Sequence, residues 1–471
     1  MRSRWIVPVT IFIVCWTLIT HGKYSVSGDE PHYLIVCQSL LADGDLDIRN
    51  NHATGQSRRF GVDNLQPGPH ARETLRGKLF SVHDIGMSVA LLPVYAAATS
   101  ASELVSESVL GRFRMNRGLF AYSLIALFLI GLTCVAAALT RAALVVDGTS
   151  PGLASMVVLA LWLSPPVLSN GFLVFPEVFA LLVTACALRI AVASPQTLSR
   201  RSTMVFAIAL GLLPWFHRKY ALYGVAVLLA VAWHQRARIA RLTMSDRAAA
   251  LTLFAVPQIA LAVWTWQCWG NVGGALVLER APFSWDAFRV GWLGLLIDRE
   301  NGLLVWAPTY VLLPVAWALA WARNRIWLLP TTALFLISAA HDQWWGGFSP
   351  AARFLVPLVP VFAFVGVVVL RDRVLRRAAI VLLVPQVMIA AYGWQHPRML
   401  WPQGDGHNRV MAALLHWTGV TEDVLPSLRA AVPQMARAAL AATLVAVANA
   451  MAWFVADGHK TRSRVGRGSG T

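Results

Sequence analysis

The chain has 471 residues, of which 57% are hydrophobic and 13% are charged, and it contains 20 tryptophans. Apolar runs long enough to span a bilayer recur throughout, so the composition excludes a soluble protein. It predicts an all-α polytopic membrane protein with about 12 transmembrane helices. The net charge of +17 does not indicate a nucleic-acid partner, because most basic residues lie in short loops between apolar runs, as in the cytoplasmic loops of membrane proteins.

The first apolar run covers residues 5–20 and follows two arginines. This pattern is shared by secretory signal peptides and first transmembrane helices. No clear cleavage site follows the run, so we expect a retained transmembrane helix in residues 1–22 with a cytoplasmic N-terminus. Residues 23–115 then form a long first extracytoplasmic loop that contains juxtamembrane helices.

Two adjacent carboxylates, Asp29 and Glu30, stand just beyond the first apolar run. Ser27 followed three residues later by Glu30 is the pattern of a capping box, and it predicts a short amphipathic helix resting on the membrane surface. The positive N-terminal end of that helix would favour the ionised form of both acids, which a general base or a cation ligand requires. The alternative is that the two acids only cap the helix.

The remaining apolar runs predict a helical bundle over residues 116–456 and a basic cytoplasmic tail over 457–471. The expected spans are 116–140, 150–168, 172–194, 202–216, 219–234, 248–269, 303–322, 325–341, 353–371, 377–393 and 431–456. All arginine-rich connections fall on one side of the membrane only if residues 85–104 do not cross it but dip into, or lie along, the outer leaflet. In the competing topology 85–104 crosses and a later segment does not.

Several outer connections carry charged residues. Glu177 follows a proline at an expected helix start, where it either caps the helix or faces protein or a water-filled cavity, because an acid is costly in lipid. The run His217-Arg218-Lys219 places cations on the side where they are disfavoured, so they need an anionic partner. That partner is either a donor phosphate, together with Arg353, or the headgroups of the outer leaflet.

A turn with two glycines, Gly346 and Gly347, precedes Arg353 and permits exposed backbone N–H groups. Trp344 and Trp345 stand directly before the glycines. They would either stack on a sugar ring as substrate-binding residues or belong to the aromatic belt at the membrane interface.

Histidines of the first outer loop form a further group of candidates. We expect His32 and His83 to contact the substrate. His70, His83 and Asp84 could also bind a divalent cation together with Asp29 and Glu30, but no ligand spacing is diagnostic, and loop histidines with ordinary hydrogen-bond partners are the alternative. No cofactor is otherwise expected.

The chain resembles the GT-C-type integral membrane glycosyltransferases, in particular bacterial relatives of the protein O-mannosyltransferase and aminoarabinose-transferase group. The resemblance covers nearly the whole chain, and its most specific motif is the acidic pair after the first helix. The segments that carry it are Gly28-Asp29-Glu30-Pro31-His32-Tyr33-Leu34, Asp43-Gly44-Asp45-Leu46-Asp47, Ser81-Val82-His83, Phe175-Pro176-Glu177, Leu295-Leu296-Ile297-Asp298 with Gly302-Leu303-Leu304, and Trp344-Trp345-Gly346-Gly347 with Arg353.

The resemblance implies an inverting transfer of a sugar from a polyprenyl-phosphate donor to an acceptor hydroxyl on the extracytoplasmic face of a bacterial-type cytoplasmic membrane. It assigns Asp29 as general base, with Glu30 as a supporting acid and Glu177 as the second outer acid. The acceptor, whether glycan, lipid or protein, stays open because the chain lacks the large C-terminal soluble domain of some members.

Two other function classes remain. A transporter or flippase of lipid-linked sugars usually places its ionisable groups near the bilayer midplane and often shows repeated halves. Here most ionisable residues lie at the outer rim, which favours an enzyme. A non-catalytic membrane scaffold would leave the outer carboxylates and cations unexplained.

Overall fold

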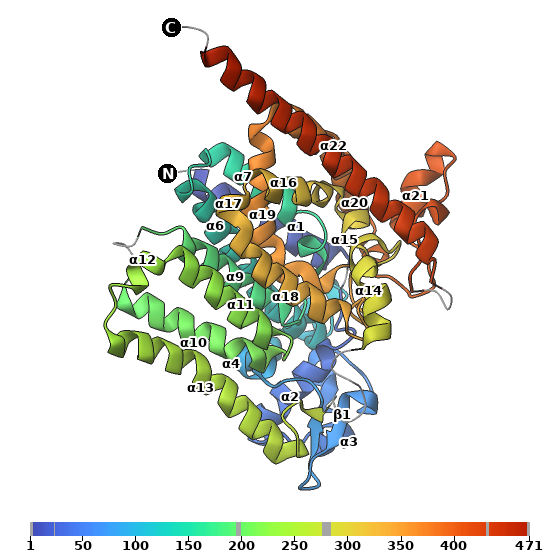
Figure 1. The fold of residues 1–471 in the computed structure, drawn as a ribbon. Helices are drawn as coiled ribbons and strands as arrows, with labels where there is room; N and C mark the ends of the chain where they lie inside the picture. The colour runs from blue at the N-terminus through green and yellow to red at the C-terminus, as the bar shows by residue number, and fades with distance from the viewer. Residues whose placement is uncertain (1–2, 23, 195–198, 276–283, 430–432, 469–471) are drawn as a thin grey trace.

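The computed structural model describes residues 3–22, 24–194, 199–275, 284–429 and 433–468. The first helix, α1 (Ser3–Gly22), leads into a segment of short elements. Several of them, among them α2, α3 and β1, form one end of the molecule at the bottom of Figure 1. The elements of this segment are α2 (Glu30–Ala42), α3 (Arg49–Ala53), η1 (Gln56–Phe60), η2 (Gly68–His70), β1 (Ala71–Glu73), β2 (Leu79–Ser81), α4 (Gly86–Leu104) and α5 (Glu107–Arg112).

The helix α2 starts about two residues later than the capping pattern predicts, with Asp29 rather than Ser27 as its N-cap residue, and it is not amphipathic. The Glu30 side chain reaches back to the start of the helix, where its Oε2 accepts a hydrogen bond from the Ser27 N–H at 3.0 Å, and Asp29 is the N-cap residue. All residues from Glu30 to Ser39 are buried, because α4 and η1 both pack against the helix. The expectation of an amphipathic helix is therefore wrong for these residues, which are internal to the protein, and the place of the helix at the membrane surface stays a prediction.

A short antiparallel hairpin of β1 and β2 follows. Ala71 pairs with Ser81 and Glu73 pairs with Leu79. The pairing continues beyond the strands, since the Val82 N–H donates to the His70 carbonyl oxygen at 2.9 Å. The hairpin therefore holds residues 70 and 83 at the same end.

The first half of the bundle is built around α6, which contacts α1, α4 and α9. Helix α10 lies between α11 and α13, and the three run side by side in Figure 1. The helices of this half are α6 (Arg117–Val146), α7 (Pro151–Trp162), α8 (Val167–Asn170), α9 (Glu177–Ala191), α10 (Arg200–Phe216), α11 (Tyr220–His234), α12 (Arg236–Ile239) and α13 (Met244–Trp269).

The second half of the bundle contributes the most deeply buried segment, which runs over residues 353–371 and contacts α6, α7 and α9. Helix α22 is a long helix along the outside of the bundle (Figure 1). The helices of this half are α14 (Trp285–Ile297), α15 (Leu303–Trp306), η4 (Pro308–Leu312), α16 (Leu313–Leu319), α17 (Trp321–Asn324), η5 (Arg325–Trp327), α18 (Leu328–Ala339), η6 (Arg353–Leu358), α19 (Val359–Gly366), η7 (Val367–Arg371), α20 (Arg373–Gln395), η8 (Pro397–Leu400), α21 (Arg409–Leu415), η9 (His416–Thr418), η10 (Glu422–Val424) and α22 (Met435–Gly468).

The helices agree with the predicted spans, since helical structure occurs in every one of them. Among the described residues, six helical segments are long and apolar enough to cross a membrane: 5–22, 117–146, 244–269, 353–371, 373–395 and 435–454. Three shorter apolar helices, 151–162, 220–234 and 308–319, accompany them. The chain is therefore an all-α polytopic membrane protein. Segment 86–104 is not among the six, and its place at the outer leaflet stays a prediction.

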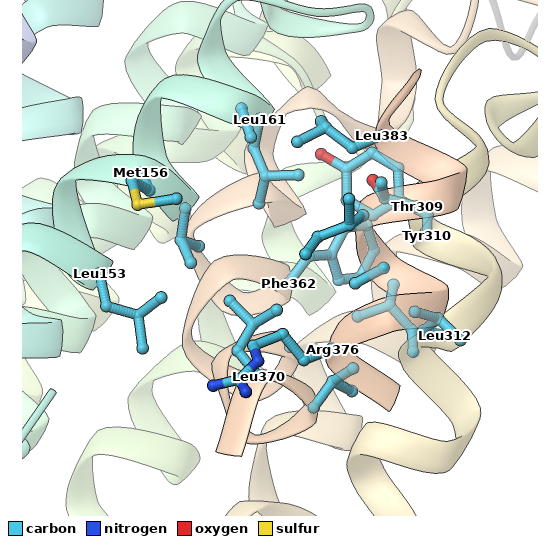
Figure 2. Close-up of a pocket in the computed structure, with 17 residues that line it drawn as sticks. Leu153, Met156, Leu161, Thr309, Tyr310, Leu312, Phe362, Leu370, Arg376 and Leu383 are labelled. Atoms are coloured by element: carbon cyan, nitrogen blue, oxygen red, sulfur yellow. The ribbon is translucent and has the colours of Figure 1, made fainter. Parts of the chain in front are cut away.

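An apolar pocket of about 190 Å³ lies among α7, η4, α19 and α20 (Figure 2). Met156, Tyr310 and Phe362 are typical of its lining, and Arg376 is the one charged residue among the described residues that line it. None of the outer carboxylates or histidines that the structure describes borders it. The charged residues singled out in the sequence therefore lie away from this pocket.

Candidate active site

The start of α2 lies directly against the turn with two glycines. Gly28 has φ +56°, and a Cβ at this position would lie 2.4 Å from the backbone oxygen of Phe348. Only glycine fits such an approach, and its positive φ also favours glycine. The contact brings Asp29, the next residue, to the buried side chain of Arg353.

Asp29 is the accessible end of a chain of four alternating charges. Arg353 Nη1 donates to Asp29 Oδ2 at 3.2 Å, and Arg353 Nε lies 3.6 Å from Glu177 Oε1. Lys219 Nζ completes the chain at 2.6 Å from the same Glu177 oxygen. The side chain of Asp29 is 27% exposed, whereas those of Arg353, Glu177 and Lys219 are 7%, 1% and 5% exposed. Asp29 is therefore the most accessible member of the four, and Arg353 stands directly beside it.

Asp29 is favoured as a carboxylate in this position. Burial acts to raise its pKa, but interactions with His83, Arg353 and His70, including the hydrogen bond from Arg353, outweigh burial and leave the pKa below its ordinary value. An ionised carboxylate at neutral pH is what a general base or a cation ligand needs.

Aromatic rings hold the guanidinium of Arg353. Its central carbon lies 4.3 Å from the ring centre of Phe175 and 5.1 Å from that of Phe354. Such stacking suits the planar guanidinium and limits its motion. Arg353 Nε and Glu177 Oε2 are both buried without a hydrogen-bond partner, so this pair keeps unused hydrogen-bonding capacity beside Asp29.

Glu30 is fully buried, and its hydrogen-bond partners are Ser27, Tyr122 and Val174. Its Oε1 accepts hydrogen bonds from the Tyr122 hydroxyl at 2.8 Å and the Val174 N–H at 2.7 Å. Burial raises its pKa to about 7, although these hydrogen bonds and those from Ser27 act to lower it. The carboxyl group thus joins α2, α6 and the 172–175 turn. It holds these elements together and is not accessible to a substrate.

Three imidazoles surround the other side of Asp29. The His32 and His70 rings are stacked with centres 3.8 Å apart, and His70 Nδ1 lies 3.1 Å from His83 Nε2. Burial lowers the pKa of His32 to about 3 and that of His83 to about 4, and it lowers the pKa of His70 as well. All three rings are therefore neutral at pH 7. One ligand atom each from Asp29, His70 and His83 lies within 4.8 Å of the others.

The other acid expected near these histidines has a different partner. Asp84 Oδ1 lies 2.9 Å from Arg218 Nε, and its Oδ2 accepts from the Arg218 N–H at 3.0 Å. The Arg218 guanidinium also donates to the Val272 carbonyl oxygen at 3.0 Å. The structure thus separates the three cations expected to act together, because Arg218 faces Asp84, Lys219 faces Glu177, and His217 accepts from the Lys219 N–H at 3.2 Å through Nδ1.

The two tryptophans of the glycine turn differ in their surroundings. Trp344 is 3% exposed, and Gly291 and Gly294 of α14 leave the space that its ring fills. It is therefore a packing residue, and the structure does not place its ring where a sugar could stack on it. Trp345 is less buried, and the guanidinium of Arg429 lies 4.7 Å from its ring centre.

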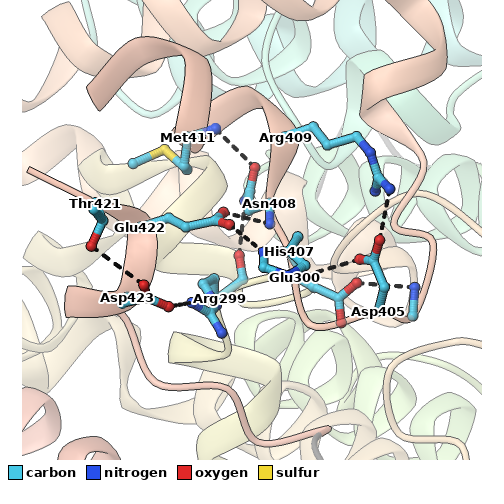
Figure 3. A network of polar contacts seen from close by, with 11 residues as sticks. Arg299, Glu300, Asp405, His407, Asn408, Arg409, Met411, Thr421, Glu422 and Asp423 are labelled. Atoms are coloured by element: carbon cyan, nitrogen blue, oxygen red, sulfur yellow. Dashed lines mark hydrogen bonds and ion pairs between the residues drawn. The ribbon is translucent and has the colours of Figure 1, made fainter. Parts of the chain in front are cut away.

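A second polar network joins the turn after α14 to the segment around α21 (Figure 3). Arg299 Nη1 lies 2.5 Å from Asp423 Oδ1, and His407 Nδ1 lies 2.7 Å from Glu422 Oε1. The buried carboxylate of Asp298 accepts from backbone N–H groups, among them that of Leu428 at 2.8 Å. These groups bond mainly to one another, so we assign the network to holding the segment around α21 in place.

The sequence did not point to Tyr122, which bonds to Glu30, nor to the ring of Phe175, which packs on Arg353. Tyr122 lies within an apolar run and gives no signal of its own. Phe175 directly precedes the Pro176-Glu177 motif, and this position was the one sequence signal that could have identified it. Both contacts depend on segments far apart in the chain.

No protein-family model matches the chain, and no curated protein matches it in sequence. Among solved structures, the chain is similar to the crystal structure of ArnT from Cupriavidus metallidurans bound to undecaprenyl phosphate, with 15% sequence identity and a TM-score of 0.44. The alignment covers 83% of this chain and 65% of that one, so the chain spans less than two thirds of that protein's length. A similarity of this degree does not by itself assign an activity to the chain.

Proposed function

We propose that this chain is an inverting membrane glycosyltransferase that moves a sugar from a polyprenyl-phosphate donor to an acceptor hydroxyl on the extracytoplasmic face. The observation that carries the proposal is the contact of Asp29 with Arg353. It places an accessible carboxylate beside a buried guanidinium that can meet a phosphate. The crystal structure of ArnT contains bound undecaprenyl phosphate, which is the kind of carrier lipid that the proposed donor would release.

In the proposed reaction, the carboxylate of Asp29 takes the proton of the acceptor hydroxyl. The acceptor oxygen forms a bond to the anomeric carbon while the bond from that carbon to the phosphate oxygen breaks on the opposite face. The configuration at the anomeric carbon inverts, and the polyprenyl phosphate leaves with the bonding electrons. The acceptor proton stays on Asp29 until water or the leaving phosphate removes it.

Arg353 supplies the positive charge that the departing phosphate needs. A guanidinium has five N–H donors, and the contact with Asp29 uses one of them. Aromatic packing fixes its plane, so little reorganisation is needed when charge develops on the phosphate. Lys219 is linked to Asp29 only through Glu177 and Arg353 in these ion pairs, and we assign it to balancing the charge of Glu177.

The test is turnover of a polyprenyl-phosphate hexose and a polyprenyl-phosphate pentose by the purified protein in nanodiscs, with membrane lipid extract as acceptor. Mass spectrometry would follow release of free polyprenyl phosphate and formation of the glycosylated acceptor. We expect Asp29→Asn to lower turnover by at least a hundredfold, as typical for loss of a general base. The matched control is Asp63→Asn, which removes a 91%-exposed carboxylate of the same outer segment.

Near-normal turnover by Asp29→Asn would overturn the assignment of the base. Movement of the intact donor across the bilayer by the wild-type protein, without cleavage of the sugar–phosphate bond, would instead favour the transporter or flippase.

A further inference from the structure

We infer that Asp29, His70 and His83 form a binding site for a zinc-type divalent cation. The inference rests on the convergence of two imidazoles and a carboxylate from separate elements, with one ligand atom of each within 4.8 Å of the others. Two histidines and one acid form a donor set that zinc accepts, and other transition-metal ions of similar preference share it.

The two imidazoles already stand at a suitable separation. His70 Nδ1 and His83 Nε2 are 3.1 Å apart. Metal–nitrogen bonds of zinc sites are about 2.0–2.1 Å, so two nitrogen ligands of a tetrahedral ion lie about 3.3 Å apart. A carboxylate oxygen of Asp29 lies within 4.8 Å of both nitrogens and would complete the set.

The backbone makes this arrangement rigid before any ion binds. The hairpin fixes the separation of the two histidines, since the Val82 N–H donates to the His70 carbonyl oxygen and the His83 N–H donates to Ser81 Oγ at 3.2 Å. Asp29 is held by its position at the start of α2. Preorganised ligands of this kind reduce the conformational entropy lost on binding.

His32 supports the site from the side. Its ring stacks on His70 at a centre-to-centre distance of 3.8 Å and an interplanar angle of 13°. The stacking fixes the plane of the His70 ring, and neighbours that orient a ligating ring commonly affect metal affinity. We treat His32 as a positioning residue of this site.

The charges around the site indicate that a bound ion would attract an anionic ligand. The negative charges of Asp29 and Glu177 balance the positive charges of Arg353 and Lys219. A bound divalent ion would therefore give the site a net positive charge. Three protein ligands leave a coordination position for water or an anionic oxygen. A phosphate oxygen fits this position. That last step, unlike the ion binding, rests on the proposed function.

The experiment measures zinc bound to the full chain, purified in detergent through an affinity tag that contains no histidine. The protein is stripped with a chelator, dialysed against zinc chloride and analysed by elemental mass spectrometry. We expect about one zinc ion per chain, as for a folded site with a complete set of ligands. Cobalt(II) in place of zinc should give the visible absorption of a tetrahedral ion.

We expect His70→Ala and His83→Ala each to weaken zinc binding by roughly tenfold or more, since loss of even a supporting group commonly costs that much. His70→Asn and His83→Asn repeat the test with polar side chains that disturb packing less. His416→Ala removes an exposed histidine outside the site and should bind as the wild type does. Melting temperatures show that each variant is folded.

Equal zinc binding by the wild type and the four site variants would overturn the inference, and so would a wild-type protein that binds no zinc. Both results concern metal content and not turnover. A protein that binds zinc at this site but releases no polyprenyl phosphate would therefore retain the metal site and lose the proposed function. A protein that releases polyprenyl phosphate but binds no zinc would retain the proposed function and lose the metal site.

Discussion

Lys219 Nζ lies 2.6 Å from Glu177 Oε1, and both side chains are almost fully buried. Glu177 belongs to the start of α9 and Lys219 to the start of α11, so the pair joins the N-terminal ends of two helices. Lys219 also lies 3.9 Å from the ring centre of Phe354. Removing one partner of such a pair leaves an uncompensated buried charge, whereas removing both does not.

We therefore expect Lys219→Met to destabilise the protein by about 3–5 kcal/mol and the double variant Lys219→Met/Glu177→Gln to recover part of that loss. The measurement is unfolding in detergent, followed by tryptophan fluorescence. As a control, Arg49→Met breaks the exposed pair of Arg49 with Glu73 and should change stability by less than about 1 kcal/mol. A double variant no more stable than Lys219→Met would contradict the expectation.

Arg353 should matter more for the reaction than its net charge alone implies. We expect Arg353→Ala to lower kcat/KM for the polyprenyl-phosphate donor roughly ten- to a hundredfold, since a charge-assisted contact is worth about 1.5–3 kcal/mol. Arg353→Lys keeps the charge but loses the planar fork that packs on Phe175, so it should restore only part of the activity. The measurement is initial rate against donor concentration. Full activity of Arg353→Ala would remove the phosphate role.

The close approach at Gly28 can be separated from its backbone conformation. Gly28 and Gly44 both have positive φ, but a Cβ at position 28 would meet Phe348, whereas a Cβ at position 44 would have nothing within 4 Å. Gly44→Ala should therefore show only the strain of the left-handed conformation, about 1 kcal/mol. Gly28→Ala should lose more stability and also lose turnover, because it moves Asp29 away from Arg353. Equal effects in both variants would show that the contact with Phe348 is unimportant.

The topology predicts which loops face outward. In a background from which the native cysteines are removed, an impermeant thiol reagent applied to intact cells should label cysteines at positions 50 and 405 but not at 240, which lies in a basic connection. All three positions are exposed on the protein, so permeabilised cells should show labelling at each. Labelling of position 240 in intact cells would overturn the proposed sidedness.

The sequence by itself determined the class of fold and the neighbourhood of the site. In a long apolar run that crosses a bilayer, the backbone N–H and C=O groups must bond within the segment, which a helix allows. The positions of the helices could therefore be read from the apolar runs. Asp29 also stood out, because an acid just outside the first apolar run can serve as a general base or a cation ligand there. Adjacent residues, however, could not be distinguished by pattern: Asp29 meets Arg353, whereas Glu30 turns inward to Tyr122 and Val174.

The tertiary structure decided the partners of each charge, because these come from segments far apart in the chain. Arg353 reaches Asp29 across 324 residues, and Arg218 is held by Asp84 rather than standing beside Lys219 as a phosphate ligand. Side-chain direction depends on backbone dihedrals and on what fills the space opposite. Trp344 shows this clearly, because its ring turns into the space left by Gly291 and Gly294. The charge on each residue is written in the sequence, but the neighbour that satisfies it is set by packing.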